Sequence, residues 1–263
     1  MRGRSFAAAL LAATLANGCA DGRVAATPPP RHYEMTPGDH RIAFDAPSDW
    51  TVVNKGSEIT IHKGSIEKGI LAIEIRDLGP AGREGVEAEV KRARELWTTG
   101  RTEDARWRLQ RIHVTRESFT TASQRNHFWE TLHDLTGAPS YTESSDIDNR
   151  FTALLDSVRT LEPQSLEESV DQALAPIEDL KNRREIVARK QITIDGHDAL
   201  LFATRYRMAH NDPRTYVVIR NGSRLLGVWM DRSRSGAPYP AFDGIVKSLR
   251  FRPSASAAPK ITI

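Results

Sequence analysis

The sequence predicts an α+β fold, an antiparallel β-sheet flanked by helices, and three observations lead to that class. Residues 191–251 alternate apolar and polar side chains at the period of two that is typical of strands. The dipeptides Asp195-Gly196 and Asn221-Gly222 divide this region at positions suited to two-residue hairpin turns. Apolar side chains then recur at helical spacing over residues 242–249. We therefore expect a closing helix after strands near residues 192–194, 200–208, 215–219 and 225–230.

The first part of the folded region predicts further short strands. Apolar residues alternate with polar ones near 42–44, 50–52, 59–61 and 71–75, and glycines at 56 and 64 mark turns between them. All of these strands lie between residues 41 and 78, so the chain builds strands at both ends of its folded part.

The middle of the chain is less regular. Apolar residues recur at helical spacing over 86–97, which predicts an amphipathic helix. Residues 109–114 indicate a strand, and residues 128–135 fit either a turn of helix or a strand, of which we predict the strand. Ser165 and Glu168 form a capping box, which predicts that a second helix begins there.

Two segments of the chain repeat one pattern. Residues 151–159, FTALLDSVR, match residues 242–250, FDGIVKSLR, at the phenylalanine, serine and arginine and at further apolar positions. This repeat predicts a duplicated closing element and two related half-domains, residues 41–163 and 164–253. Chance similarity, or convergent packing of a helix on a sheet, is the alternative.

Three segments resemble the Mog1/PsbP-like family. They are IAFDAPSDWTVV at residues 42–53, YVVIRNGSRLLGV at 216–228 and FDGIVKSLRF at 242–251. Residues 79–163 depart from the usual length of that family. The resemblance implies an antiparallel sheet flanked by helices, and a role as a non-enzymatic assembly or interaction module.

Residues 1–18 have the pattern of a bacterial lipoprotein signal peptide. Arg2 and Arg4 supply the charged start, and residues 6–16 form an apolar run too short to span a bilayer permanently. The run ends at Leu15-Ala16-Asn17-Gly18-Cys19, which resembles a lipobox. The resemblance implies that Cys19 carries a thioether-linked diacylglycerol and an acylated amino terminus, which would anchor the protein to a membrane. Ordinary signal-peptidase cleavage and a short buried helix are the alternatives.

The residues beside the cysteine predict where the protein is held. Ala20 follows Cys19 where aspartate could stand, and in proteobacterial lipoproteins this favours the outer membrane, facing the periplasm. Residues 19–40 are rich in proline and predict an extended tether. Residues 254–263 are small or polar and predict a disordered tail.

Composition is that of an ordinary globular protein, with 39% hydrophobic and 27% charged residues. Cys19 is the single cysteine, so no disulfide can form within the chain. The formal net charge is +3, and loss of Arg2 and Arg4 would lower it by two, so we expect no nucleic-acid partner. Acids are concentrated at 143–179 and bases at 186–252, which predicts two faces that attract each other, or a basic face that meets an anionic surface.

The sequence indicates no catalytic, cofactor-binding or metal-binding residue. Glu143, Asp146, Asp148 and Asn149 loosely resemble a calcium loop, but its glycine and closing glutamate are missing, and an acidic helix N-terminus explains these residues as well. The histidines have no metal-ligand spacing and are expected on the surface or in turns: His32, His40, His62, His113, His127, His133, His197 and His210.

Together these patterns predict a lipid-anchored protein of the bacterial envelope that acts as a non-enzymatic binding or assembly module for an unidentified envelope protein. The alternatives are an envelope hydrolase without a recognisable motif and a spacer lipoprotein without a ligand. A pocket with convergent polar groups and a histidine or carboxylate of shifted pKa would favour the hydrolase. An exposed apolar patch on a sheet face would favour partner binding.

The lipid anchor is tested by the substitution Cys19→Ser. Without the thiol no diacylglycerol can be attached, so the variant should move from the membrane pellet to the soluble fraction when cells are fractionated and the protein is detected by immunoblot. Unchanged membrane association of the variant, at the same expression as the wild type, would refute the anchor.

Overall fold

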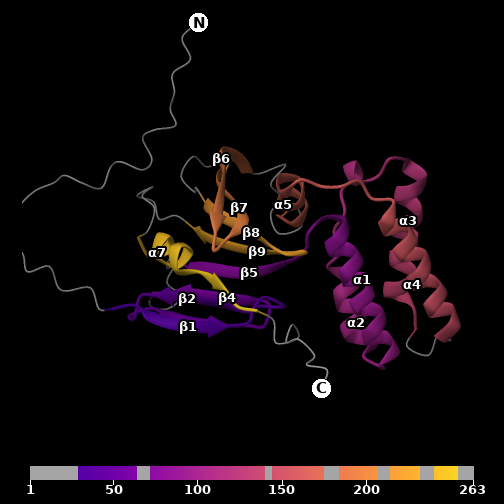
Figure 1. The fold of residues 1–263 in the computed structure, drawn as a ribbon, viewed down its shortest axis with the longest axis horizontal. Coiled ribbons are helices and arrows are strands. Elements are labelled where there is room, and N and C mark those ends of the chain that lie inside the picture. The colour runs from indigo at the N-terminus through magenta and orange to yellow at the C-terminus, as the bar shows by residue number, and fades with distance from the viewer. Residues whose placement is uncertain are drawn as a thin grey trace, which may run out of the picture.

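The fold is taken from a computed structural model that describes residues 29–63, 72–139, 144–174, 184–206, 214–231 and 240–253. The predicted signal peptide, Cys19 and the predicted tail at 254–263 lie outside these ranges. The described residues form two antiparallel sheets, which the helices cover or stand beside (Figure 1).

A small sheet begins the fold. Strands β1 (Arg31–Met35) and β2 (Ile42–Ala46) form a hairpin, and β10 (Arg250–Phe251) pairs with the other edge of β2. The predicted tether at 19–40 is therefore wrong from residue 31 onward. Tyr33 packs on the hydrophobic core, and this apolar contact outweighs the proline-rich composition that suggested an extended spacer.

The large sheet has seven strands in the order β3-β4-β5-β9-β8-β7-β6, and every neighbouring pair is antiparallel. The predicted α+β class with an antiparallel sheet is thereby confirmed. The pair β5–β9 joins the strands of the first part of the chain to those of the last part. The strands are β3 (Thr51–Asn54), β4 (Glu58–His62), β5 (Ala72–Pro80), β6 (Arg184–Ile194), β7 (His197–Tyr206), β8 (Arg214–Asn221) and β9 (Arg224–Asp231).

Both faces of the large sheet are covered. One face packs on the small sheet and on α7 (Pro240–Ser248), and Val217 points to this side. The other face packs on α5 (Leu166–Leu174), and Tyr216 points to that side. Adjacent residues of a strand face opposite ways, so apolar residues at successive positions of β8 fill two separate cores. This explains why the sequence shows apolar residues on both faces.

The predicted hairpin turns and the predicted helix cap lie at or within one residue of their expected positions. Asp195 and Gly196 form the β6–β7 turn with φ values of 51° and 81°, as a type I′ hairpin requires. The β8–β9 turn is formed by Gly222-Ser223, one residue later than predicted, because Asn221 already pairs with Arg224. The capping box that opens α5 is present, since the Ser165 hydroxyl accepts a hydrogen bond from the backbone N–H of Glu168 at 3.2 Å.

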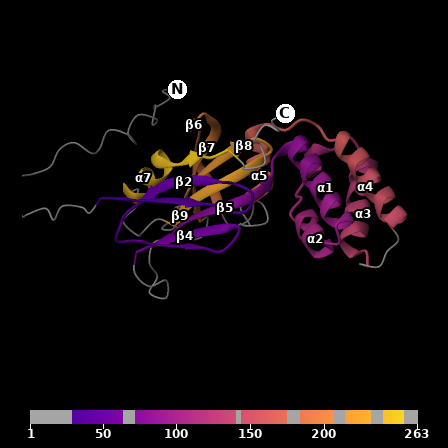
Figure 2. The same cartoon turned by 60° about the horizontal axis from the view of Figure 1, so that its bottom comes forward.

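A cluster of helices stands beside one end of the large sheet, and α5 lies between the cluster and the sheet (Figures 1 and 2). The helical cluster follows β5 directly in the chain and has its own hydrophobic core. Trp97, Leu109, Phe128 and Phe151 contribute to this core. The cluster consists of α1 (Gly82–Thr98), α2 (Thr102–Gln110), the short 3₁₀-helix η2 (Arg116–Ser118), α3 (Ala122–Gly137) and α4 (Ser144–Arg159).

The strands predicted at 109–114 and 128–135 are wrong, because the structure has helix α2 ending at Gln110 and helix α3 over the second segment. Thr121 and Gln124 form a capping box that starts α3, and this signal was missed. The buried apolar residues that follow are spaced for a helix packed on other helices, so tertiary packing decided the ambiguous segment.

The predicted half-domains are also not borne out. Residues 151–159 lie in α4, which packs among helices and is followed by a turn and coil. Residues 242–250 instead place α7 on the sheet and lead into β10. The shared pattern therefore reflects amphipathic helices in two environments. One sheet joins both parts of the chain through β5 and β9.

Candidate functional site

Charged side chains and one histidine that are distant in sequence meet where β5 and β9 adjoin helices α1 and α2. We call this set the ion-pair network: Asp39, His40, Asp77, Glu89, Arg108, Arg111 and Arg224. The side chain of Asp77 has 0% of its surface exposed and that of Glu89 has 4%. Buried carboxylates are stable only when cations and hydrogen-bond donors surround them, and both conditions are met here.

Asp77, on β5, accepts hydrogen bonds from several directions. Nη2 of Arg224 donates to Oδ2 over 2.7 Å, and the backbone N–H of Gly79 donates to Oδ1 over 3.0 Å. Nη1 of Arg111 lies 3.3 Å from Oδ2, and Nε2 of His40 lies 3.4 Å from Oδ1. Burial alone would raise the pKa of Asp77. The hydrogen bond to His40 and the charges of Arg224 and Arg111 outweigh it and hold the pKa well below its ordinary value of 3.8.

Asp39 and Glu89 share two guanidinium groups. Both Nη atoms of Arg108 donate to the Asp39 carboxylate, over 2.9 and 3.0 Å, and Nη1 also lies 3.0 Å from Oε1 of Glu89. Arg224 bonds to Glu89 as well and lies 3.1 Å from Asp39. The hydrogen bond from Arg108 lowers the pKa of Asp39. The loop after β1, helix α1, helix α2 and strand β9 are therefore joined by charged contacts, of which the Arg108–Asp39 contact is bidentate.

The loop after β1 approaches Asp77 closely. Gly38 has φ of 60°, and a Cβ atom at this position would lie 2.1 Å from Oδ2 of Asp77. Only glycine allows both the backbone conformation and this contact. His40 follows with 1% of its surface exposed, and its Nε2 lies 3.2 Å from the backbone oxygen of Leu225. The expectation that histidines lie on the surface or in turns is wrong for His62, which is buried on β4. His40 closes a turn, since its backbone N–H donates to the Pro37 oxygen, but it is buried and not on the surface.

The network is suited to holding elements together more than to transferring protons. A general acid or base works best with a pKa near the operating pH, whereas the environment of Asp77 drives its pKa in the opposite direction. Its oxygen atoms are also already bonded to Arg111, Arg224 and Gly79. A buried pair of this kind is costly to break, since removal of one partner leaves an uncompensated buried charge.

A cleft of about 420 Å³ opens beside the network. Its walls come from the β3–β4 turn, strands β4 and β5, the end of α2 and helix α5. The volume is within the range of small-molecule sites. We call it the cleft, and it is lined by Ser57, Glu58, Arg76, Asp77, Leu78, Trp107, Arg111, His113 and Ala173.

Two tryptophan–arginine contacts lie at the cleft. Trp107 is 46% exposed, and the guanidinium of Arg111 lies 4.5 Å from the centre of its ring. Arg76 lies 5.2 Å from the ring centre of the buried Trp229 and forms an ion pair with Glu58. Arg111 is likewise paired, because it bonds to Asp77. The cleft thus presents one open indole among charges that are already neutralised.

Besides Asp77, His113 is a titratable group of the cleft with a shifted pKa. Burial, with the added charge of Arg111, lowers the pKa of His113 below its ordinary value of 6.5, so the imidazole is neutral at pH 7. A histidine of shifted pKa in a polar cleft is one of the features that we expect of a hydrolase. In the described part of the chain, however, no hydrogen bond joins His113 to Ser57 or Glu58.

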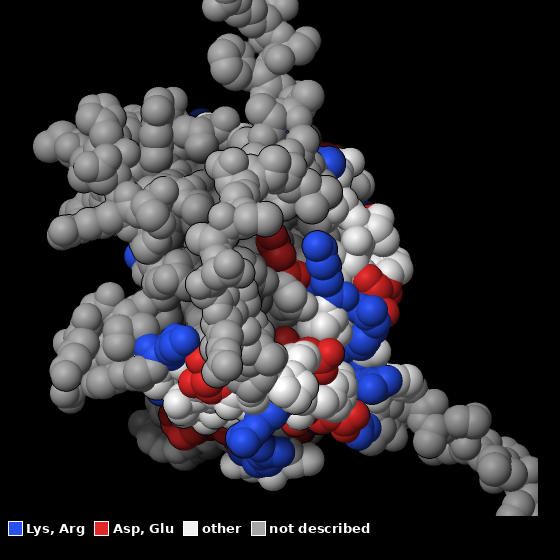
Figure 3. Space-filling view, turned by 90° about the vertical axis from the view of Figure 1, so that its left-hand side faces the viewer, with Lys and Arg blue, Asp and Glu red and all other residues white. Residues whose placement is uncertain are grey.

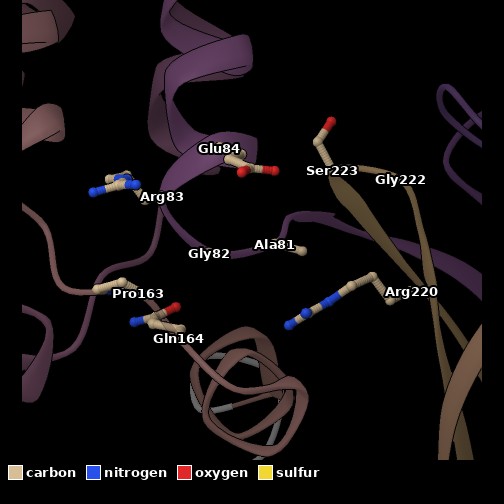
Figure 4. Close-up of a pocket in the computed structure, with 9 residues that line it drawn as sticks. All are labelled: Ala81, Gly82, Arg83, Glu84, Pro163, Gln164, Arg220, Gly222 and Ser223. Carbon is tan, nitrogen blue, oxygen red and sulfur yellow. The ribbon is translucent and has the colours of Figure 1, made fainter.

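A smaller hollow of about 170 Å³ lies at the start of α1, lined by residues of α1, of the segment before α5 and of the β8–β9 hairpin (Figure 4). The side chain of Arg220 extends into this hollow and donates to the Ser169 hydroxyl over 3.0 Å. Ala81 precedes α1 and supplies no side-chain cap, while the carboxylate of Glu84 also lines the space. The hollow therefore mixes donors suited to an anion with a group that repels one.

The residues singled out from sequence do not converge on a site. Cys19 and Glu143 lie outside the described residues. Asp146 is in the first turn of α4 and pairs with Arg150, which agrees with the helix N-terminus and not with a calcium loop. Within the described ranges, no cluster of three or more histidine, cysteine or acidic residues is placed to hold a metal ion.

The network was missed, although part of its signal was present. Asp77 falls on the same face of its strand as Ile73 and Ile75, so an acid occupies a position in an apolar row. Glu89 likewise falls on the buried side of helix α1. An acid at a core position predicts a buried cationic partner. The partner Arg224, however, is 147 residues away in sequence from Asp77, so the pattern does not identify it.

The predicted separation of charge is realised as contacts within the fold. Arg189 of the basic segment pairs with Asp171 of α5 at 2.7 Å and lies 3.7 Å from Glu167. On the face shown in Figure 3, described lysines and arginines are interspersed with acids and form no continuous basic patch. Of the two alternatives, the arrangement therefore favours mutual attraction between the acidic and basic segments. It does not favour a basic surface that binds anionic lipids.

Comparisons with known proteins were made with both the sequence and the fold. The sequence matches no protein-family model and no curated protein. Solved structures similar to the chain include the solution structure of cyanobacterial PsbP (CyanoP) from Synechocystis sp. PCC 6803, with a TM-score of 0.36 and 13% identity over 90% of this chain and 98% of that chain. At this level the likeness carries no inference about function. Among the described residues, no helix has the length and apolar character needed to cross a bilayer.

The network predicts a pH-dependent contribution to stability from Asp77. Asp77→Asn should lower the free energy of unfolding by about 3–5 kcal/mol at pH 7, because Arg111 and Arg224 would lose a buried counter-charge. The pKa of Asp77 is lowered by folding, so its stabilisation is present above the ordinary value of 3.8 and is lost as pH falls below it. In urea denaturation at pH 7, 4 and 3, the difference in free energy of unfolding between wild type and variant should decrease as the pH falls.

The matched control is Asp146→Asn, which removes an exposed acid from a pair within α4. It should change stability by less than about 1 kcal/mol at each pH. A difference between Asp77→Asn and wild type that is constant from pH 7 to pH 3 would contradict the account of the network.

Proposed function

We propose that the protein is a lipid-anchored, non-enzymatic binding module of the bacterial envelope, and that the cleft is its binding site. The observation that carries the proposal is the exposed indole of Trp107, held by Arg111 at the mouth of a cleft of ligand size. A large aromatic side chain left open beside fixed polar groups is typical of binding sites.

The network supports this proposal by fixing the walls of the cleft. Asp77 and Arg111 line the cleft and also belong to the network, so two of its polar walls are held by buried ion pairs. A site that is already ordered pays less conformational entropy when a ligand binds. The network therefore stabilises the cleft in one shape without itself contributing free charge to it.

The anchor determines how the cleft would be presented. If Cys19 is lipidated, residues 20–30 connect it to the start of β1 and can span at most about 40 Å. The tether is thus shorter than the sequence suggested. In Figure 1, β1 begins at the end of the sheets away from α3 and α4.

A second candidate is an envelope hydrolase, and one observation favours it. Ser57 and His113 line the same cleft, and His113 is neutral at pH 7, the state required of a general base. A catalytic imidazole is normally hydrogen-bonded to its nucleophile and to a group that orients it, and the described structure has neither bond for His113. Binding without catalysis is therefore the function that the geometry supports best.

The binding module is tested by photo-crosslinking in living cells. Trp107, in the cleft, is replaced by a photoreactive phenylalanine analogue, and the matched control carries the same analogue at Trp129, which is 38% exposed on α3. Irradiation should give an adduct from position 107 that depends on Cys19, because the anchor places the cleft beside its partner. Adducts of equal amount from both positions, or none from position 107, would count against the cleft as the binding site.

The hydrolase is tested with purified protein and the substitution His113→Gln, which keeps a hydrogen-bonding side chain but removes the base. The wild type should release no more product from isolated cell walls or from a p-nitrophenyl ester than the variant does. A rate at least tenfold above that of the variant would reverse the order of the two candidates.

A further inference from the structure

The charges of the cleft cancel in pairs. Arg76 pairs with Glu58, and Arg111 pairs with the fully buried Asp77. A ligand with a net charge would have to compete for one member of a pair and leave the other uncompensated, which is costly for a buried group such as Asp77. The lining therefore favours a ligand without net charge.

The same side chains retain unused capacity for hydrogen bonds. A guanidinium has five donor hydrogens, and the hydrogen bonds of Arg111 to Asp77 come only from its two Nη atoms. The neutral imidazole of His113 offers one donor and one acceptor, and Ser57 adds a hydroxyl. Donors and acceptors thus stand side by side, which suits a ligand carrying many hydroxyl groups.

The indole of Trp107 supplies the apolar part of the site. Arg111 lies over the ring, yet 46% of the residue is still exposed, so a flat apolar surface is open at the cleft. A ligand that satisfies the whole lining must combine a flat face of C–H groups with hydroxyls around its rim. A pyranose ring has this combination, with C–H groups on its faces and hydroxyls at its edge.

We propose that the cleft binds a neutral sugar chain, with one pyranose ring stacked on Trp107 and its hydroxyls bonded to Arg111, His113 and Ser57. The inference rests on the proposed function and names the ligand class of the same site. A volume of about 420 Å³ accommodates a short segment of such a chain, while the open mouth lets the remainder extend into solvent.

The test is a calorimetric titration of the purified chain from Ala20 onward with two uncharged trisaccharides, chitotriose and cellotriose. These probes share the β-1,4 linkage and differ at the substituent on C2. At least one should bind, and Trp107→Ala should weaken that binding about tenfold, which corresponds to about 1.4 kcal/mol, because the sugar ring would lose its stacking surface. Trp107→Phe should retain part of the affinity.

The matched control is Trp129→Ala, which removes the other large exposed indole and should leave affinity unchanged. Circular dichroism and the melting temperature verify that each variant is folded. Glucose 6-phosphate serves as a charged probe and should bind more weakly than the trisaccharides. Tighter binding of the phosphate, equal loss in the two tryptophan variants, or binding of neither trisaccharide would overturn the proposal.

Failure of this inference is distinguishable from failure of the proposed function. If position 107 forms a Cys19-dependent adduct with a protein in cells while neither trisaccharide binds, the cleft is a binding site for a polypeptide and the sugar proposal is wrong. If the adduct at position 107 instead disappears after digestion of the glycan with a glycosidase, the sugar proposal is supported.

Discussion

The ionised carboxylate of Asp77, sealed from water and held by Arg111, Arg224 and His40, is the constraint on which the arrangement of the molecule depends. A charge in this position is tolerable only if its partners are fixed, and each partner comes from a different element. Because the partners must stay in place, the loop after β1, the end of α2 and the start of β9 are held at one point on β5.

Hydrophobic packing alone would not fix this geometry. The helical cluster has its own core around Phe128 and Phe151, separate from the two cores that sandwich the large sheet. Apolar contact is not directional, so cores that do not merge leave the angle between helices and sheet weakly specified. Bidentate contacts such as Arg108 with Asp39 are directional and supply that specification. The cleft exists because the cluster is held beside the sheet in this way.

This arrangement relates stability to the proposed binding site. Arg111 bonds to Asp77 inside the network and lies over Trp107 at the cleft, so one side chain belongs to both. A binding surface built on such a residue is ordered before any ligand arrives. The same pairing neutralises the charges of the cleft, and for that reason the ligand inferred for it is uncharged.

Several features of the fold could be read from sequence because their causes are local. The type I′ turn at Asp195-Gly196 needs only two residues that tolerate positive φ, and the alternation around β8 needs only neighbouring side chains. The segment at 128–135 could not be assigned in the same way. Its apolar residues fit a strand or a helix, and contact with α4 and α2 decided for the helix.

The sequence by itself determined the α+β class, the positions of most strands along the chain and the capping box at Ser165, since each follows from spacing along the chain. It also indicated the lipid anchor at Cys19, which remains a prediction. The tertiary structure decided the ion-pair network and the cleft. Asp77 is far in sequence from Arg111 and Arg224, and no periodicity records which distant charges will meet when a helical cluster is folded against a sheet.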